Sequence, residues 1–442
     1  RPLILTVVFL LVLQHCLSDR IISVGHNSQG QLGIGNRVSH FEYSLLSSSG
    51  DFGSSWTLTS MCAGRAYGAF VLSTGRVLVT GNNGFGQLGL GTFSDALSPS
   101  YIPQTGVFVA SANIKIASAI CGYYHLILVD TNGAVYASGR NSEGQLGLGN
   151  LEGRNRFAQI KNGFSSNKIK GGCAGDAFTL AYDEEGTLFS WGYGRWGQLA
   201  NGTISSSSSP INASSVPAGE KISQLSCGAD FVIALMKSGK VYSWGHNAGG
   251  QLGNGALVDS YVPVDISASG SLASYTPASV TAGYAFAAVL TTSGNVISWG
   301  LNDEGQLGAG NRIATATPTL VSTTVTFSEL KAGFSHIIGC NSATKKAQGW
   351  GRNLIGQTGD LDTNLAYSPR SAYPDWQCQT LALGDDFSYA FTKGNDGYGL
   401  VGTFGSDVDE SGGSRLERTS SSSSSVMIMC LLMALIVAVL SL

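Results

Sequence analysis

The chain has 442 residues, and only 12% of them are charged. Lysine and arginine total 25 against 28 acidic residues, so the formal net charge is −3. No basic patch or stripe stands out along the sequence, which argues against a nucleic-acid-binding protein.

The first 18 residues have the order of parts of a secretory signal peptide. Arg1 precedes an apolar stretch at residues 3–13 that only Thr6 interrupts, and a short stretch at residues 14–18 follows. A β-strand is the alternative for the apolar stretch, but a strand needs only about four to eight residues. We therefore expect residues 1–18 to be a signal peptide that is cleaved before Asp19.

A Gly-Gln-Leu-Gly element recurs seven times after this segment. The copies begin at Gly30, Gly86, Gly144, Gly197, Gly250, Gly305 and Gly356. The spacing runs from 51 residues (305 to 356) to 58 residues (86 to 144), and a period of this size indicates a solenoid, a propeller or an array. We expect the Leu to anchor its loop in the core and the Gln to bond backbone groups that the loop leaves unpaired.

A second glycine introduces an apolar run in each repeat, and we call it the hairpin glycine. The seven hairpin glycines are Gly64, Gly122, Gly175, Gly228, Gly283, Gly333 and Gly384. In the fourth repeat, an apolar run at residues 231–236, a Lys-Ser-Gly-Lys turn and a strand at residues 241–244 follow this glycine. Strand, glycine-bearing turn and strand together predict a β-hairpin.

The repeats show no long stretch of helical periodicity, so we predict an all-β fold. Seven sheets of about four strands suit a seven-bladed β-propeller over residues 19–406 that terminal strands close into a ring. An open stack is the alternative. Two candidate strands, at residues 21–25 and 398–404, compete to complete the last blade. We expect the N-terminal one to close the ring and the C-terminal one to lie outside it.

Two segments carry a resemblance to a known family. Residues 245–253 (Gly-His-Asn-Ala-Gly-Gly-Gln-Leu-Gly) and residues 121–126 (Cys-Gly-Tyr-Tyr-His-Leu) resemble the repeat of the regulator of chromosome condensation family. The resemblance covers residues 20–405 in all seven repeats and implies a seven-bladed propeller. It also implies an alternative function, guanine-nucleotide exchange on a Ran-like small GTPase, because exchange factors of the family use acidic and histidine loop residues against Ran.

The departures from the family pattern are small. Ala200 replaces the last glycine of the fourth copy, and Thr358 replaces the leucine of the seventh. The Trp-Gly signature is lost in the first three copies and kept in four, at Trp191, Trp244, Trp299 and Trp350.

The candidate site lies in the loops that follow the hairpin glycines, because a propeller gathers these loops on one face around its channel. Four members are acidic: Asp176, Asp230, Asp385 and Asp386. The other five are Arg65, Tyr123, Tyr124, Tyr284 and Phe334. Ordinary turn polarity would explain the aspartates, but aromatic residues with an arginine are typical interface anchors. We therefore predict a protein-protein interaction module that binds an unknown partner through one rim, without catalysis, metal or cofactor. A hydrolase in the channel has only the aspartates for support.

Histidines and cysteines give no sign of catalysis or of a metal site. His125 and His336 occupy a position that aromatic residues hold in other repeats, which indicates packing. Four cysteines lie one or two residues before a hairpin glycine, and we interpret them as packing and not bridging residues. These are Cys62, Cys121, Cys173 and Cys227. Cys340 and Cys378 remain, and an oxidising compartment would allow them to pair.

The C-terminal end resembles a lipid-anchor signal. Residues 426–442 carry no charge, and a Ser-rich polar spacer at residues 407–425 precedes them. Small residues, spacer and apolar tail are the parts of a glycosylphosphatidylinositol attachment signal, with attachment expected near Ser411, Gly412 or Gly413. A short transmembrane helix is the alternative. We expect a membrane-anchored cell-surface protein of the secretory pathway, with glycosylation sequons at Asn201 and Asn212.

Overall fold

The computed structural model describes residues 20–46, 57–108, 114–164, 168–372 and 378–392. The predicted signal peptide, spacer and tail lie outside these residues, as do Ser411, Gly412 and Gly413 and the candidate strand at residues 398–404. In the described part of the chain, no helix is both long and apolar enough to cross a membrane. Residues 21–392 form one compact unit.

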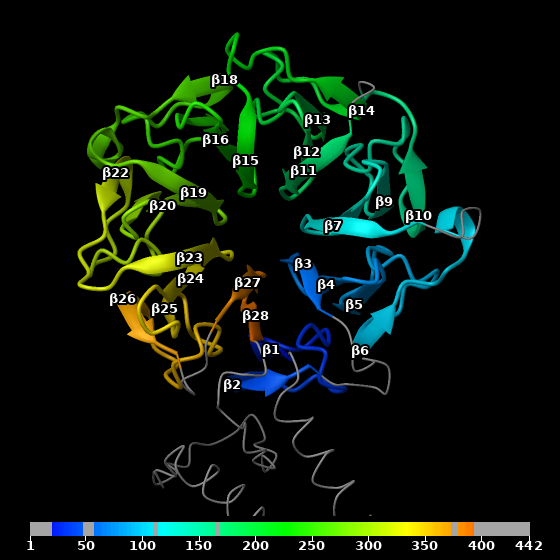
Figure 1. Ribbon diagram of the computed structural model, residues 1–442, viewed down its shortest axis with the longest axis horizontal. Coiled ribbons are helices and arrows are strands. Elements are labelled where there is room, and N and C mark those ends of the chain that lie inside the picture. Colours follow the sequence, from blue (N-terminus) through cyan, green and yellow to red (C-terminus); the bar gives the residue numbers. More distant parts are fainter. Residues whose placement is uncertain (1–19, 47–56, 109–113, 165–167, 373–377, 393–442) are drawn as a thin grey trace, which may run out of the picture. The chain divides into compact units, whose positions relative to one another are not determined.

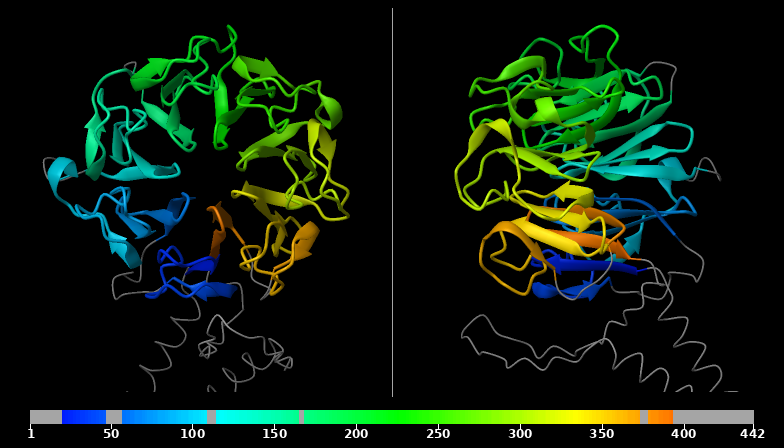
Figure 2. Two further views of the ribbon diagram at one scale, coloured as in Figure 1. Left: turned by 180° about the vertical axis from the view of Figure 1, so that it is seen from behind. Right: turned by 60° about the vertical axis from the view of Figure 1, so that its left-hand side comes forward.

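Seven four-stranded antiparallel sheets stand around a central axis, as Figure 1 shows face-on and Figure 2 shows from behind and obliquely. Blades I to VI each take four consecutive strands: β3–β6, β7–β10, β11–β14, β15–β18, β19–β22 and β23–β26. Blade VII has the order β2-β1-β28-β27 and so joins the two ends of the described chain. The predicted seven-bladed propeller is confirmed, and the N-terminal strand closes the ring.

The innermost strand of each blade lines the central channel. These strands are β3 (Leu58–Ala63), β7 (Ile116–Cys121), β11 (Ile169–Ala174), β15 (Ile222–Cys227), β19 (Pro277–Ala282), β23 (Phe327–Ala332) and β27 (Thr380–Leu383). The second strands are β4 (Tyr67–Leu72), β8 (His125–Asp130), β12 (Phe178–Asp183), β16 (Phe231–Met236), β20 (Phe286–Thr291), β24 (His336–Asn341) and β28 (Phe387–Thr392).

The third and outer strands complete each blade. The third strands are β5 (Val77–Gly81), β9 (Val135–Gly139), β13 (Leu188–Gly192), β17 (Val241–Gly245), β21 (Val296–Gly300), β25 (Ala347–Gly351) and β1 (Arg20–Gly25). The outer strands are β6 (Ala96–Tyr101), β10 (Arg154–Ile160), β14 (Ser207–Asn212), β18 (Ser260–Asp265), β22 (Thr315–Leu320), β26 (Ala366–Ser371) and β2 (His40–Leu45). Two short 3₁₀ helices, η1 (Gly106–Phe108) and η2 (Gly270–Ser274), each follow the outer strand of one blade and precede the innermost strand of the next. The second and third strands are almost fully buried, so the hydrophobic core lies between neighbouring blades.

The Gly-Gln-Leu-Gly loop joins the third strand to the outer strand, and its side chains have the predicted roles. In blade IV, Leu252 is buried and its N–H donates to Asn247 Oδ1 at 2.9 Å. Gln251 Oε1 accepts from the N–H of Gly249 at 2.8 Å. The same glutamine bond recurs in all seven loops. The side chains of the repeated loop therefore satisfy backbone N–H groups of the same loop, and its leucine anchors it in the core.

Two disulfides link innermost strands of neighbouring blades, so the packing interpretation of four cysteines is wrong. Cys62 in β3 pairs with Cys121 in β7, and Cys173 in β11 pairs with Cys227 in β15. The Cα atoms are 5.6 Å and 5.5 Å apart, within the range of a disulfide. In each pair, the first cysteine lies two residues before the hairpin glycine of its own blade, and the second cysteine lies one residue before the hairpin glycine of the next blade. Neighbouring innermost strands touch at these two positions.

Other blades use the same two positions without cysteine. Between blades V and VI, Thr281 Oγ1 accepts a hydrogen bond of 2.9 Å from the N–H of Ala332. Between blades IV and V, Ser226 Oγ accepts one of 2.9 Å from the N–H of Ala282. The third disulfide joins Cys340 in β24 to Cys378, just before β27, which is the pair that an oxidising compartment allows. It ties blade VI to the closing blade.

Candidate functional site

The loop between the innermost and second strands reaches the same end of the channel in every blade. We call this end the rim and define it as the two residues after each hairpin glycine. The rim residues are 65–66, 123–124, 176–177, 229–230, 284–285, 334–335 and 385–386. All nine predicted binding residues therefore belong to one surface feature.

Backbone hydrogen bonds join the seven rim loops into a closed circle. Each loop donates an N–H group to a carbonyl of the loop in the next blade. The seven bonds are Arg65 to Tyr123 (3.3 Å), Tyr123 to Gly175 (3.1 Å), Asp176 to Ala229 (3.0 Å), Ala229 to Tyr284 (3.1 Å), Tyr284 to Phe334 (2.9 Å), Phe334 to Gly384 (3.1 Å) and Asp385 to Arg65 (3.3 Å). Because main-chain groups hold the circle, rim side chains can vary without loss of the scaffold, which is the arrangement that recognition loops use.

Aromatic side chains from three blades meet at the mouth of the channel. The rings of Tyr284 and Phe334 stack with centroids 4.2 Å apart, and Tyr123 of blade II lies 6.4 Å from Phe334. Tyr284 remains 42% exposed. Beneath the rings, a cavity of about 300 Å³ is lined by the innermost strands of all seven blades. The mouth thus presents an apolar, rigid centre to solvent.

On the side of blades I and VII, the rim charges neutralise each other. Arg65 Nε lies 3.4 Å from Asp385 Oδ2, and Arg65 also donates to the Tyr124 hydroxyl. Arg352, on the loop after β25, places its Nε 3.1 Å from Asp386 Oδ1. Burial, followed by the neighbouring Asp386 carboxylate, raises the pKa of Asp385 to about 6 although Arg65 acts in the opposite direction.

On the side of blades III and IV, the described rim carboxylates are not held in ion pairs. Among the described residues, neither Asp176 nor Asp230 forms an ion pair, and Asp230 Oδ1 accepts only a 3.4 Å bond from Gln198 Nε2. Burial, followed by the Asp176 carboxylate, raises the pKa of Asp230 to about 6. Burial also raises the pKa of Asp176, although Arg140 and Arg65 act in the opposite direction. Among the described residues, the rim carboxylates are therefore ion-paired on the side of blades I and VII but not on the side of blades III and IV.

The buried histidines lie behind the rim and face the core. His125 Nε2 is 2.8 Å from Thr179 Oγ1, and His336 Nε2 is 2.9 Å from Ser388 Oγ. Burial lowers the pKa of each imidazole to about 3, with nearby arginines adding to the effect. Both side chains are fully buried, as their interpretation as packing residues requires. In the described part of the chain, no group of three His, Cys, Asp or Glu side chains is placed to hold a metal ion.

The sequon asparagines lie at the ends of one segment of blade III. Asn201 is half-buried, and its Oδ1 accepts bonds from the N–H (3.0 Å) and hydroxyl (2.9 Å) of Thr203. Asn212, the last residue of β14, is exposed. Their glycosylation stays a prediction.

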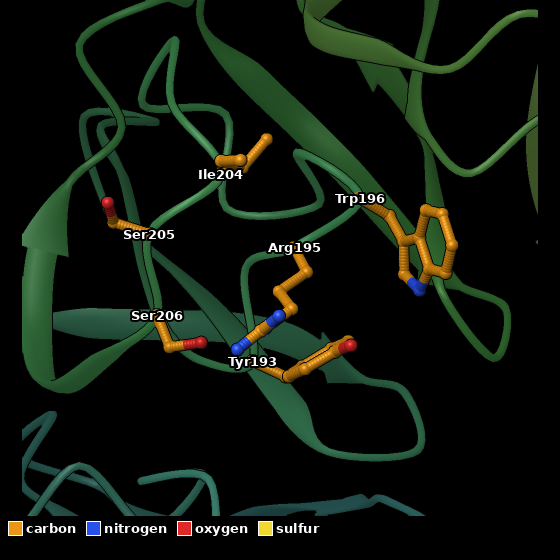
Figure 3. Close-up of a pocket in the computed structure, with 6 residues that line it drawn as sticks. All are labelled: Tyr193, Arg195, Trp196, Ile204, Ser205 and Ser206. Carbon is orange, nitrogen blue, oxygen red and sulfur yellow. The ribbon is translucent and has the colours of Figure 1, made fainter.

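One surface feature was not foreseen from the sequence. The loop between β13 and β14 forms an open depression of about 800 Å³, which Tyr193, Arg195, Trp196, Ile204, Ser205 and Ser206 line (Figure 3). The Trp196 ring lies 4.5 Å from that of His246 in the next blade. The available signal was the loop position before Gly-Gln-Leu, where this repeat has Arg-Trp and the others have Ser-Gln, Gly-Phe, Ser-Glu, Ala-Gly, Asp-Glu and Leu-Ile.

Comparison with known families agrees with the repeat pattern. The model of the Regulator of chromosome condensation (RCC1) repeat matches residues 74–129, 132–182, 185–235, 238–290 and 293–339. A second model of the same description matches residues 116–145, 222–251 and 278–306.

Two relatives illustrate the range of proteins with this sequence pattern. The chain is 31% identical to the Ultraviolet-B receptor UVR8 of Arabidopsis thaliana over 343 residues, 77% of this chain and 74% of that protein. It is 33% identical to the E3 ubiquitin-protein ligase HERC2 of Homo sapiens over 208 residues, 47% of this chain but only 4% of that protein.

Solved structures support the same fold. Human WBSCR16 superposes with a TM-score of 0.74 at 20% identity, over 85% of this chain and 99% of that one. Prp20p from Saccharomyces cerevisiae also superposes with a TM-score of 0.74, at 22% identity, over 85% and 92%. At these identities the likeness establishes the architecture alone.

Proposed function

This chain belongs to the Regulator of chromosome condensation (RCC1) repeat family, and we propose that it is a non-catalytic, protein-binding propeller anchored at the cell surface. The observation that carries the proposal is the rim, where a backbone circle fixes an aromatic centre of Tyr123, Tyr284 and Phe334. Aromatic residues beside an arginine on a rigid scaffold are typical of interface hot spots.

The three disulfides support a location outside the cytosol. All six cysteines in the described residues are paired, and disulfides persist in oxidising compartments but are rare in the reducing cytosol. The predicted signal peptide at residues 1–18 and the predicted anchor signal, with attachment near Ser411, Gly412 or Gly413, agree with this location.

Location is tested on intact cells that express the full chain. We expect an impermeant biotin reagent to label the protein, and a phosphatidylinositol-specific phospholipase to release it into the medium. Labelling without release would indicate that a transmembrane tail, and not a lipid anchor, holds the protein at the surface. Absence of labelling, with free cysteine thiols in the extracted protein, would refute the surface location.

Partner binding is tested with a photo-crosslinking amino acid placed at Tyr284 on the rim. The matched control carries the same group at Ser238, an exposed residue in the turn between β16 and β17, at the opposite end of the blade. We expect a discrete crosslinked protein from the Tyr284 position and none from the control. Equal crosslinking from both positions would remove the rim as the binding surface.

Guanine-nucleotide exchange on a Ran-like GTPase is the second candidate. Prp20p, which shares the fold of this chain, has binding properties toward Gsp1p and histones. The aspartates of the rim suit a basic surface on such a partner. Stimulated nucleotide release from purified Ran by the full chain would favour this candidate, whereas the disulfides favour a protein that never meets a cytosolic GTPase.

A further inference from the structure

The depression on blade III is formed by one loop and is held open by that loop's own hydrogen bonds. Gln198 Oε1 accepts from the N–H of Trp196 at 2.9 Å, and Ser206 Oγ accepts from the N–H of Gly194 at 3.2 Å. Both limbs of the loop are thus fixed before any ligand arrives. In Figure 3 the side chain of Arg195 extends toward Tyr193 and Ser206, while Trp196 projects from the other side of the loop.

Arg195 is the charged group of this depression, and it has no internal partner. Among the arginines that the structure describes, Arg195 alone has no hydrogen bond, ion pair or ring contact. By contrast, Arg65 at the rim pairs with Asp385, and Arg352 on the loop after β25 pairs with Asp386. Arg312, on the loop after β21, donates to the carbonyl of Asp303. A guanidinium that is exposed and unused within the fold is free to bind an anion.

The apolar neighbours of Arg195 are also exposed. Trp196 is 36% exposed and Ile204 is 55% exposed, whereas the other four tryptophans in the described residues are fully buried. The depression therefore combines one free cation, two exposed apolar side chains and the serine hydroxyls of Ser205 and Ser206. It is also continuous with the rim, because Trp196 contacts His246, whose N–H donates to the carbonyl of Asp230 at 3.0 Å.

We propose that this depression binds an acidic segment of a protein partner, with the carboxylate of an aspartate or glutamate held by the Arg195 guanidinium. The planar guanidinium matches a carboxylate with two parallel hydrogen bonds. Apolar residues on either side of that carboxylate pack against Trp196 and Ile204. The proposal rests on the proposed function in one respect, that the partner is a protein. It adds that this partner is acidic where it meets the loop between β13 and β14 and basic where it meets Asp176 and Asp230 at the rim.

The probe is an acetylated pentapeptide amide with one glutamate between two leucines, titrated into the full chain in detergent and followed by calorimetry. Matched peptides carry glutamine or lysine in place of glutamate. We expect saturable binding of the glutamate peptide near 1 mM, an affinity of about −4 kcal/mol. The glutamine and lysine peptides are expected to bind about tenfold more weakly or not at all.

Variants assign the binding to the depression. Arg195→Gln is expected to lower the affinity for the glutamate peptide about tenfold. Arg195→Lys should restore only part of this affinity, because lysine cannot form two parallel hydrogen bonds with a carboxylate. Arg312→Gln is the matched control, since Arg312 is an exposed arginine that is already bonded within its own loop. Tyr284→Ala at the rim should leave peptide binding unchanged.

Three results would overturn the proposal: equal binding of the three peptides, no glutamate-dependent binding, or an unchanged affinity in Arg195→Gln. If free glucuronic acid displaced the glutamate peptide at an equal concentration, the depression would be a site for an acidic sugar. That result would overturn the proposal as well. Failure of the rim crosslinking with glutamate-specific binding intact would refute the proposed rim interface alone. Rim crosslinking without glutamate discrimination would refute only the acidic-peptide site.

Discussion

The indole Nε1 of Trp244 donates a hydrogen bond of 3.0 Å to the backbone carbonyl of Gln198, in the loop of the preceding blade. Two signatures of the repeat, a tryptophan in the third strand and a glutamine in the loop, thus form one contact between two blades. Trp191, Trp299 and Trp350 make the same bond. In blade II, Ser138 takes the place of the tryptophan, and its Oγ donates to the carbonyl of Gln87 at 2.9 Å.

Loss of this link should destabilise the ring. Ser138→Ala removes the donor with little change of volume and leaves the buried carbonyl of Gln87 unpaired, at a cost of about 1–3 kcal/mol. Urea unfolding should therefore show a lower midpoint with an unchanged slope. Ser142→Ala, in the loop after β9, is the control and should be neutral. An unchanged midpoint in Ser138→Ala would mean that this bond does not contribute to stability.

Replacing Ala200 by glycine should stabilise the protein. Ala200 has a φ of 50°, whereas Gly253 at the same loop position has a φ of 70°. A left-handed conformation costs a residue with a side chain roughly 1–2 kcal/mol, and glycine avoids that cost. We expect Ala200→Gly to raise the free energy of unfolding by about 1 kcal/mol, less the small loss from the buried methyl group. A lower melting temperature would show that the packing of the methyl group outweighs the backbone strain.

The buried imidazole of His336 should make the protein sensitive to acid. Its pKa falls to about 3 through burial, followed by the effect of Arg352, from a reference of 6.5. Below about pH 6.5 the unfolded chain binds a proton that the folded chain does not, so the free energy of unfolding decreases by about 1.4 kcal/mol per pH unit for this group. His336→Phe, which places the phenylalanine of other blades at this position, should remove that dependence. Urea unfolding between pH 4.5 and 7 measures it, and parallel curves for both proteins would contradict the expectation.

Asp230 should lower stability at neutral pH, as functional groups often do. Its pKa is about 6 in the folded chain against a reference of 3.8, so the folded state holds the proton more tightly. The free energy of unfolding is therefore unaffected by this group in acid, where Asp230 is protonated in both states. It falls as the pH rises, and the full loss is present above about pH 6. Asp230→Asn should raise the free energy of unfolding at pH 7.5 by on the order of 1–2 kcal/mol and weaken crosslinking to the partner at the rim. If the variant were stabilised but crosslinked to the partner as well as the parent does, Asp230 would not be part of the binding surface.

The disulfide between Cys173 and Cys227 should be structural. Its removal in a double alanine variant frees a closed segment of 54 residues in the unfolded chain, which costs about 2–4 kcal/mol. We expect a lower urea midpoint but an unchanged circular dichroism spectrum at low temperature. The double variant of Cys62 and Cys121, with a separation of 59 residues, should lose a similar amount. A midpoint equal to that of the parent would show that the bond does not form in the isolated protein.

Much of the fold could be predicted, because the repeat places the same polar and apolar side chains at the same loop and strand positions. The loop geometry depends only on residues close in sequence, as the bonds made by Asn247 and Gln251 and the position of Leu252 show. The disulfides could not be derived so directly, because they depend on how inner strands of two blades align. The alternating offset of Cys62, two residues before its hairpin glycine, and Cys121, one residue before, was the available signal.

The rim was predictable in position but not in contact pattern. Loop equivalence placed Asp176, Asp230 and Asp385 on one face, yet only the structure shows that Asp385 pairs with Arg65 whereas Asp176 and Asp230 form no ion pair with any described residue. Arg195 and Trp196 escaped prediction because they lie in the Gly-Gln-Leu-Gly loop, whose repeated residues serve the fold. A residue that departs from the repeat in such a loop has a side chain free for other contacts.

Blade VII sets the order in which the ring can be completed during synthesis. Of the described strands, β1 leaves the ribosome first and β28 last, with residues 26–386 between them. At about 5–20 residues per second, this interval lasts roughly 20–70 s. For that time one edge of β1 has no partner, and an open strand edge is a site of aggregation. The edge of β1 that β28 later covers therefore stays unpaired until nearly the whole propeller has been synthesised.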